Sequence, residues 1–186
     1  MVVMEEVLAE VRRRPAVGGI RLVGVDGPSG SGKSTFARRL AAVAGAPVIE
    51  ADDFLSWGDF SGWWTRFDQE VLGPLLSGRD ARYRVRDWQR DEFGSSLRPE
   101  CKVVRWAPLT ILDGVTTTRR AISDRLAYRV WVDAPRRQRL MRGLARDGED
   151  HRDRWLRWQD EEDRFFGDDA TRSRADLVID TTDPAG

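Results

Sequence analysis

One short segment of the sequence carries the residue types and spacing needed to hold a phosphate chain. Residues 27–35 read G-P-S-G-S-G-K-S-T and satisfy the pattern G-x-x-x-x-G-K-[ST]. Glycine lets the backbone approach a ligand closely, so that consecutive N–H groups can point at a phosphate. Lys33 would bridge the β- and γ-phosphates, and the Ser34 hydroxyl would ligate Mg²⁺. The expected nucleotide-binding residues are Gly27, Ser29, Gly30, Ser31, Gly32, Lys33, Ser34 and Thr35.

The lysine content agrees with this interpretation. Among 31 basic residues, Lys33 and Lys102 are the two lysines. A compact ammonium fits along a phosphate loop more easily than a planar guanidinium. Lys102 stands in E-C-K-V-V, which does not fit the Asn/Thr-Lys-x-Asp pattern of guanine-specific sites. We therefore expect ATP and Mg²⁺ as the cofactors.

The elements around this loop indicate a parallel sheet. Strand-like apolar stretches occur at residues 20–26, 47–50, 109–113, 128–133 and 176–180, and helical patterns at 5–14, 33–43 and 135–146. Alternating strands and helices favour βαβ units, in which ligands bind at the carboxyl ends of the strands. Aspartates stand at or just past these ends, and we expect them on one edge of the sheet: Asp26, Asp52, Asp113, Asp133 and Asp180.

Residues 57–107 depart from this alternation. They predict a helix at 62–76 and paired strands near 83–88 and 101–106. We interpret the segment as an insertion beside the site, within one domain that spans residues 1–186.

In order and spacing, these motifs resemble the uridine/cytidine kinase-like branch of the P-loop nucleoside kinases. That branch has G-x-S-G-S-G-K-[ST], then Asp-x-Phe-Tyr, then an acidic residue and glycine; the matches are residues 27–34, 52–55 (with Leu55 in place of Tyr) and 113–114. A strand ending in V-D, a helix with R-L-x-R-x-x-x-R-D and a last strand A-D-x-V-I are matched at 132–133, 139–147 and 175–179. The likeness runs from about residue 20 to 180.

The resemblance implies an α/β P-loop NTPase fold. It implies a five-stranded parallel sheet in the order 2-3-1-4-5, helices on both faces and a mobile lid at about residues 146–154. Asp52 would be the general base that accepts the acceptor's proton, with Asp53 as its rival; an N-cap or a ligand of Mg²⁺-bound water is the alternative for Asp52. Asp113 would hold Mg²⁺ through water, or else be a turn residue before Gly114.

The same resemblance assigns lid arginines to the transferring phosphoryl group. Arg146, Arg152 and Arg154 fall at the corresponding positions, and cations there would neutralise transition-state charge. Arg146 and Arg152 are the catalytic candidates, together with Lys33 and Asp52. His151 lies in the same charged stretch, where we expect a solvated lid residue.

The acceptor side departs from the family pattern. Uridine/cytidine kinases carry an acid that grips the ribose, and Thr65 stands in its place here. Tryptophans gather in the insertion, either to stack a flat acceptor or to form the core of a small subdomain. The expected acceptor-binding residues are Asp53, Phe54, Trp64, Arg86 and Trp88.

Composition limits the remaining functions. The 31 acidic residues balance the 31 basic residues, so we expect neither a nucleic-acid nor a membrane partner. No apolar run reaches the roughly 20 residues of a membrane span, and residues 1–14 do not resemble a signal peptide. The single cysteine, Cys101, is expected to be structural, and the chain is expected in the cytoplasm. Homo-oligomerisation stays open.

The sequence thus predicts a kinase that moves the γ-phosphate of Mg-ATP to a hydroxyl of a small molecule. A nucleoside or nucleoside-like acceptor is the leading hypothesis. Sugar acids, vitamins and antibiotics are alternative acceptors. A protein of another class, an ATP-binding regulatory switch, is the second alternative.

Overall fold

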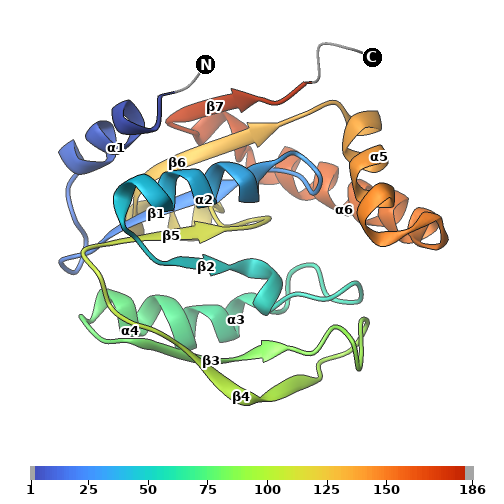
Figure 1. Cartoon of the computed structure of the whole chain (residues 1–186), viewed down its shortest axis with the longest axis horizontal. Coiled ribbons are helices and arrows are strands. Elements are labelled where there is room, and N and C mark those ends of the chain that lie inside the picture. Colours follow the sequence, from blue (N-terminus) through green and yellow to red (C-terminus); the bar gives the residue numbers. More distant parts are fainter. Residues whose placement is uncertain (1–2, 183–186) are drawn as a thin grey trace.

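A five-stranded parallel sheet forms the centre of the molecule. The computed structural model describes residues 3–182. The strands lie in the order β2-β5-β1-β6-β7 (Figure 1). They are β1 (Arg21–Asp26), β2 (Val48–Glu50), β5 (Leu109–Asp113), β6 (Leu126–Asp133) and β7 (Leu177–Asp180). Counted among themselves, these strands have the order 2-3-1-4-5, so the predicted α/β fold and topology are confirmed. The outermost residues of the predicted domain, 1–2 and 183–186, lie outside the described residues.

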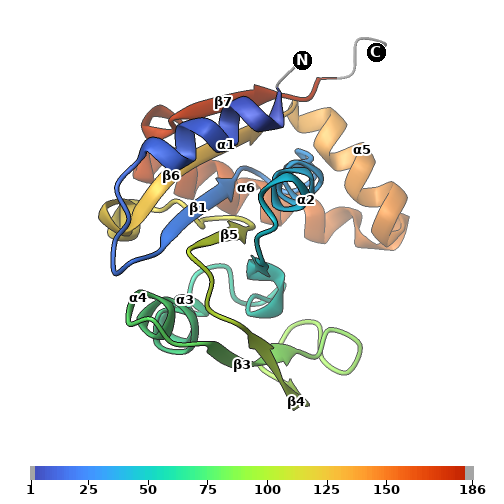
Figure 2. The same cartoon turned by 60° about the vertical axis from the view of Figure 1, so that its left-hand side comes forward.

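Helices cover both faces of this sheet (Figures 1 and 2). On one face lie α1 (Met4–Arg13) and α2 (Lys33–Ala44), and on the other lies α6 (Arg152–Asp169). Neighbouring residues of β1 serve opposite faces because side chains alternate along a strand. Val23 and Val25 pack in one core with Phe36 of α2, whereas Leu22 belongs to a second core that includes Trp158 of α6.

The chain passes from α5 (Arg136–Asp147) to α6 at the predicted lid. Gly148 ends α5 with a φ of 98°, a 3₁₀ turn covers Glu149–His151, and α6 begins at Arg152. Helix α6 has 18 residues and was not predicted. The mobility of the lid stays a prediction.

The predicted insertion packs beside β2, below the main sheet in Figure 1. Its helical run consists of α3 (Trp64–Phe67), a π-helical turn (Asp68–Leu72) and α4 (Gly73–Leu76). The antiparallel strands β3 (Ala81–Arg86) and β4 (Leu97–Val104) follow, and both begin earlier than predicted. Trp63, Phe67 and Tyr83 share one core with Leu22 and Ile49 of the main sheet, so the insertion and the sheet have a continuous interior.

None of the helices within residues 3–182 combines the length and apolar character that a membrane span requires.

Candidate functional site

The phosphate-binding segment, residues 27–35, lies between the end of β1 and the start of α2. Gly27 and Gly30 adopt φ values of 144° and 80°, in the region that favours glycine. A Cβ at Gly27 would lie 2.1 Å from the carbonyl oxygen of Val132, and one at Gly30 would lie 2.5 Å from that of Arg139. The loop therefore packs directly against the main chain of β6 and α5, and only glycine fits at these two positions.

A buried carboxylate anchors the start of this loop. Asp26 is fully buried, and its Oδ1 accepts hydrogen bonds from the main-chain N–H groups of Gly27 (2.7 Å) and Thr116 (2.8 Å). Its Oδ2 accepts from the N–H (2.8 Å) and the hydroxyl (2.9 Å) of Thr118. Burial raises the pKa of Asp26 to about 6, although these four donors act in the opposite direction. Asp26 thus ties the loop to the chain that follows β5.

A second buried carboxylate comes from α6 and was missed by sequence reasoning. Glu162 is fully buried, and its Oε1 accepts hydrogen bonds from the main-chain N–H of Ser29 (2.7 Å) and the indole N–H of Trp158 (2.9 Å). Arg139 of α5 pairs with its Oε2 at 3.3 Å. Burial raises the pKa of Glu162, whereas the charge of Lys33 and the hydrogen bonds from Ser29 lower it. The helix after the lid therefore contacts the phosphate loop directly.

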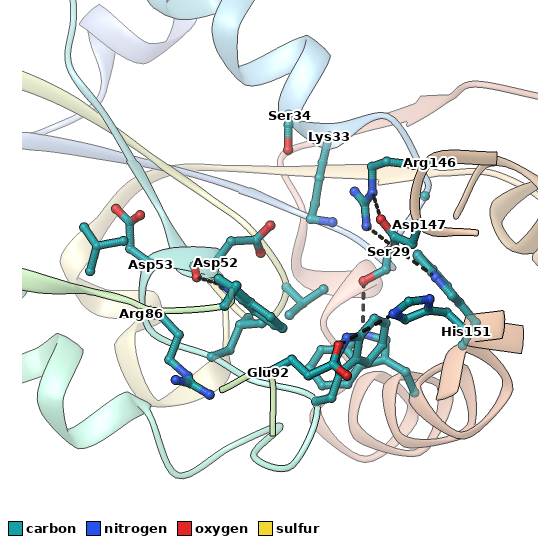
Figure 3. Close-up of a pocket in the computed structure, with 18 of the residues that line it drawn as sticks. Ser29, Lys33, Ser34, Asp52, Asp53, Arg86, Glu92, Arg146, Asp147 and His151 are labelled. Carbon is teal, nitrogen blue, oxygen red and sulfur yellow. Dashed lines mark hydrogen bonds and ion pairs between the residues drawn. The ribbon is translucent and has the colours of Figure 1, made fainter. Parts of the chain in front are cut away.

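Two cavities meet beside the phosphate loop. The loop cavity, of about 380 Å³, follows the loop and the start of α2. The tryptophan cavity, of about 620 Å³, opens toward the insertion and is lined by Trp57, Trp88, Trp155 and Trp158. Five residues line both cavities, namely Gly30, Lys33, Ser34, Asp52 and Arg146. Figure 3 shows Lys33 and Asp52 pointing toward the same space, where the two cavities join.

The predicted Mg²⁺ residues lie together in the loop cavity. Asp113 is 3% exposed, and within the described part of the chain its Oδ1 has no hydrogen-bond partner. Burial raises the pKa of Asp113 to about 6, whereas the Lys33 charge and the Ser34 hydroxyl lower it. A divalent cation would supply the missing partner, and Mg²⁺ typically combines one or two carboxylates with substrate phosphates and water. Ser34 and Asp113 therefore fit Mg²⁺, although no group of three or more His, Cys, Asp or Glu in residues 3–182 could hold a metal ion.

The two adjacent aspartates after β2 have different surroundings. Asp53 is 8% exposed, and its Oδ2 accepts hydrogen bonds from the Tyr83 hydroxyl (2.9 Å) and the Lys102 ammonium (2.7 Å). The Asp52 side chain is exposed, and its carboxylate has no hydrogen-bond or ion-pair partner among residues 3–182. Its main-chain oxygen accepts from the Trp88 indole at 2.9 Å, which fixes the backbone while the carboxylate faces both cavities.

The two candidate catalytic arginines of the lid also differ. Arg146 lines both cavities, and its Nε donates to Oδ1 of Asp147 at 2.7 Å. That contact raises the pKa of Arg146. Arg152 lines neither cavity and pairs with Glu149 at 2.7 Å on the surface. The structure brings Arg146 to the site and leaves Arg152 outside it.

Arg154 and His151 contact the insertion instead. Arg154 pairs with Oε1 of Glu92 at 2.5 Å, and its guanidinium lies 4.5 Å from the Phe93 ring centre. Nε2 of His151 lies 3.6 Å from Oε2 of the same Glu92. Both Glu92 and His151 line the tryptophan cavity, where the start of α6 meets the loop between β3 and β4.

The predicted acceptor residues fall into two groups. Asp53, Arg86 and Trp88 line the tryptophan cavity. Phe54 and Trp64 do not line it; Phe54 is 5% exposed in the core, and Trp64 packs against the same core under the guanidinium of Arg119, 4.0 Å from the ring centre. The indoles of the insertion are thus divided between core and cavity.

The strand order, the glycine-rich loop and the lysine at the start of α2 define the chain as a P-loop NTPase fold. A sequence profile of the AAA domain family matches residues 23–167, and the chain belongs to this family. Among curated proteins, no sequence matches significantly.

Solved structures resemble the chain at the level of the fold. A possible uridine kinase from Bacillus stearothermophilus has a TM-score of 0.70 at 18% identity, with 95% of this chain and 97% of that chain covered. A protein from Silicibacter sp. TM1040, proposed to be a fructose transport system kinase, has a TM-score of 0.54 at 20% identity, with 96% and 99% covered. The sequence-based identification of a uridine kinase-like P-loop NTPase fold is confirmed.

Proposed function

We propose that the chain is an ATP-dependent kinase that phosphorylates a hydroxyl of a small, nucleoside-like molecule. The observation that carries this proposal is the junction of the two cavities, where an unpaired carboxylate faces the lysine of the phosphate loop. A nucleotide switch has no need of a second cavity with a free base at the phosphate end. The likeness in fold to a possible uridine kinase agrees with the proposal.

Each residue at the junction has a distinct task in this reaction. Ser34 and Asp113 would hold Mg²⁺, which would supply a divalent charge beside the phosphates of ATP, the phosphoryl donor. Asp52 orients the acceptor hydroxyl and accepts its proton as the new O–P bond forms and the bond from the γ-phosphorus to the β–γ bridging oxygen breaks. Lys33 holds the β- and γ-phosphates, and Arg146 offsets charge on the phosphoryl oxygens in transit. ADP and a phosphate monoester leave.

The exposure of Asp52 supports its assignment as the base in preference to Asp53. A general base needs a lone pair that is free to accept a proton. Oδ2 of Asp53 already accepts hydrogen bonds from Tyr83 and Lys102. Asp53 is therefore suited to position the side chains that would bind the acceptor. The proposed reaction needs ATP, which a location in the cytoplasm would provide. It does not depend on whether the chain forms a homo-oligomer.

Paired substitutions test the assignment. Asp52→Asn keeps the shape of the side chain but cannot accept a proton, so kcat should fall by about 10²- to 10⁴-fold. Asp53→Asn is the matched variant and should mainly raise the KM for the acceptor. Affinity for Mg-ATP, measured by titration calorimetry, should change little in both, because the phosphates are held by the loop. A larger loss of kcat in Asp53→Asn would identify Asp53 as the base. A kcat near wild type in both variants would refute base catalysis by either aspartate.

A further inference from the structure

The carboxylates of the tryptophan cavity are neutralised by cations, with one exception. Asp52 is the exception, as described above. The other three each pair with a basic side chain: Asp53 with Lys102 at 2.7 Å, Glu92 with Arg154 at 2.5 Å, and Asp147 with Arg146 at 2.7 Å. Thr65, which replaces the acid of the resembled family, is exposed and does not line the cavity. Little negative charge is therefore left to recognise a neutral sugar.

Two further arginines of the same cavity form no ion pair with any described residue. Arg86 is 2% exposed; its guanidinium donates to the main-chain oxygens of Ser96 (2.6 Å) and Asp91, and no carboxylate of residues 3–182 forms an ion pair with it. Arg98 of β4 lines the cavity, and its guanidinium makes no hydrogen bond or ion pair with any described residue. The Arg86 charge is partly balanced by the nearby Asp91 carboxylate. The Arg98 side chain is exposed and free to pair with an anion in the cavity.

The remaining walls are flat and apolar. The ring of Trp57 makes edge-to-face contacts with three other indoles of the cavity, with ring centres 5.4 to 6.4 Å apart: those of Trp88, Trp155 and Trp158. Leu55, Val85 and Val115 complete the apolar lining. In Figure 3, Arg86 lies across the cavity from Arg146 and Lys33. A ring-shaped ligand could therefore place one end near the phosphate loop and the other near the arginines.

We propose that the acceptor is a ring compound that carries both a hydroxyl and an acid group. The hydroxyl faces Asp52, the ring lies among the indoles, and a carboxylate or phosphate binds Arg98, with the charge of Arg86 behind it. Guanidinium groups suit such anions because they can donate two parallel hydrogen bonds. This inference rests on the proposed kinase function and narrows its substrate class.

Pairs of acceptors that differ only in an acid group test whether the site prefers an anionic acceptor. Orotidine and uridine differ by one carboxylate, as do 4-(hydroxymethyl)benzoate and benzyl alcohol, and 4-(hydroxymethyl)phenyl phosphate adds the phosphate arm with its hydroxyl free. We expect kcat/KM for the acid of each pair to exceed that for the neutral partner by about 10-fold or more, because charge-assisted hydrogen bonds are the strong ones. In Arg98→Gln the acid-to-neutral ratio should fall toward one through KM. Arg82→Gln, an exposed arginine of the neighbouring strand that does not line the cavity, should keep the wild-type ratio.

The outcomes separate the two proposals. If neutral acceptors are phosphorylated as well as the acids, the acid inference is overturned and the kinase function stands. An acid preference that survives in Arg98→Gln also overturns the assignment of the anion site. If no member of either set is phosphorylated, and tryptophan fluorescence detects no binding of the acids in the presence of a non-hydrolysable ATP analogue, the inference fails together with the substrate class that it narrows.

Discussion

The phosphate loop and the tryptophan cavity, the proposed acceptor side of the site, are built in opposite ways. The phosphate side comes from one continuous segment, residues 27–35, whose main chain packs against the main chain of β6 and α5. The tryptophan cavity is assembled from side chains of β3, β4, the turn after β2 and the start of α6, far apart in the sequence. A backbone cradle binds a phosphate with main-chain N–H groups, which do not depend on the side chains nearby, whereas a wall of side chains can change its ligand by single substitutions.

The same difference explains what the sequence could predict. The strands around the loop and the loop itself depend on local patterns, apolar stretches and glycine at fixed spacing, and were predicted with small shifts at their ends. The contact between Glu162 and Ser29 joins residues 133 positions apart, and no local pattern indicates it. Helix α6 was missed because charged residues dominate its sequence, R-D-R-W-L-R-W-Q-D-E-E-D-R, even though Trp155 and Trp158 are buried.

For the proposed acceptor side, sequence reasoning selected part of the segment that lines the tryptophan cavity, but not the orientation of each side chain. Phe54 and Trp64 lie in the segments expected to face the acceptor, yet they belong to the core or pack against it. Trp57, which makes three of the cavity's ring contacts, was not selected. Phe54 and Trp57 lie in turns after β2 and Trp64 begins α3, so whether each ring faces the core or the cavity depends on how these turns pack, which the sequence alone does not state.

The largest expected effect comes from the lysine of the phosphate side. Lys33→Ala removes the positive charge that would lie beside the β- and γ-phosphates, and we expect phosphotransfer to fall by about 10³-fold or more while the fold is kept. Lys102→Ala removes the other lysine, which pairs with Asp53 on the acceptor side, and should cost far less in kcat. Circular dichroism and ATP-dependent turnover of both variants provide the measurement. Comparable losses of kcat in the two variants would contradict the difference proposed between the phosphate side and the acceptor side.

Next in size is the rigidity of the backbone cradle. Gly27→Ala places a Cβ against the carbonyl oxygen of Val132 and should lower the free energy of unfolding by about 3 kcal/mol or more. The control, Gly45→Ala, also has a positive φ (63°), but its Cβ would meet no atom within 4 Å, so strain alone should cost about 1 kcal/mol. Urea unfolding of the two variants measures the difference. Equal costs would mean that the loop tolerates a side chain and is not held by this contact.

A prediction with a smaller effect tests which of the two lid arginines belongs to the site. Arg146→Ala should lower kcat by about 10²-fold because its guanidinium lies where both cavities meet. Arg152→Ala should stay within a few-fold of wild type, since Arg152 pairs with Glu149 on the surface. Steady-state kinetics of both variants with one acceptor measures the two changes in kcat. A loss in Arg152→Ala as large as in Arg146→Ala would require the lid to move Arg152 into the site on binding.

Transfer of label from the γ-phosphate of ATP tests the central claim most directly. The purified chain would be incubated with γ-labelled ATP and Mg²⁺, with and without each acceptor of the matched panel, and the labelled products separated. If the junction between Lys33 and Asp52 is a transfer site, ADP should form faster in the presence of an acceptor, and the label should appear in an acid-stable phosphate monoester of it. If ADP forms at one slow rate regardless of acceptor and the label appears only in inorganic phosphate, the chain hydrolyses ATP and the kinase account is wrong.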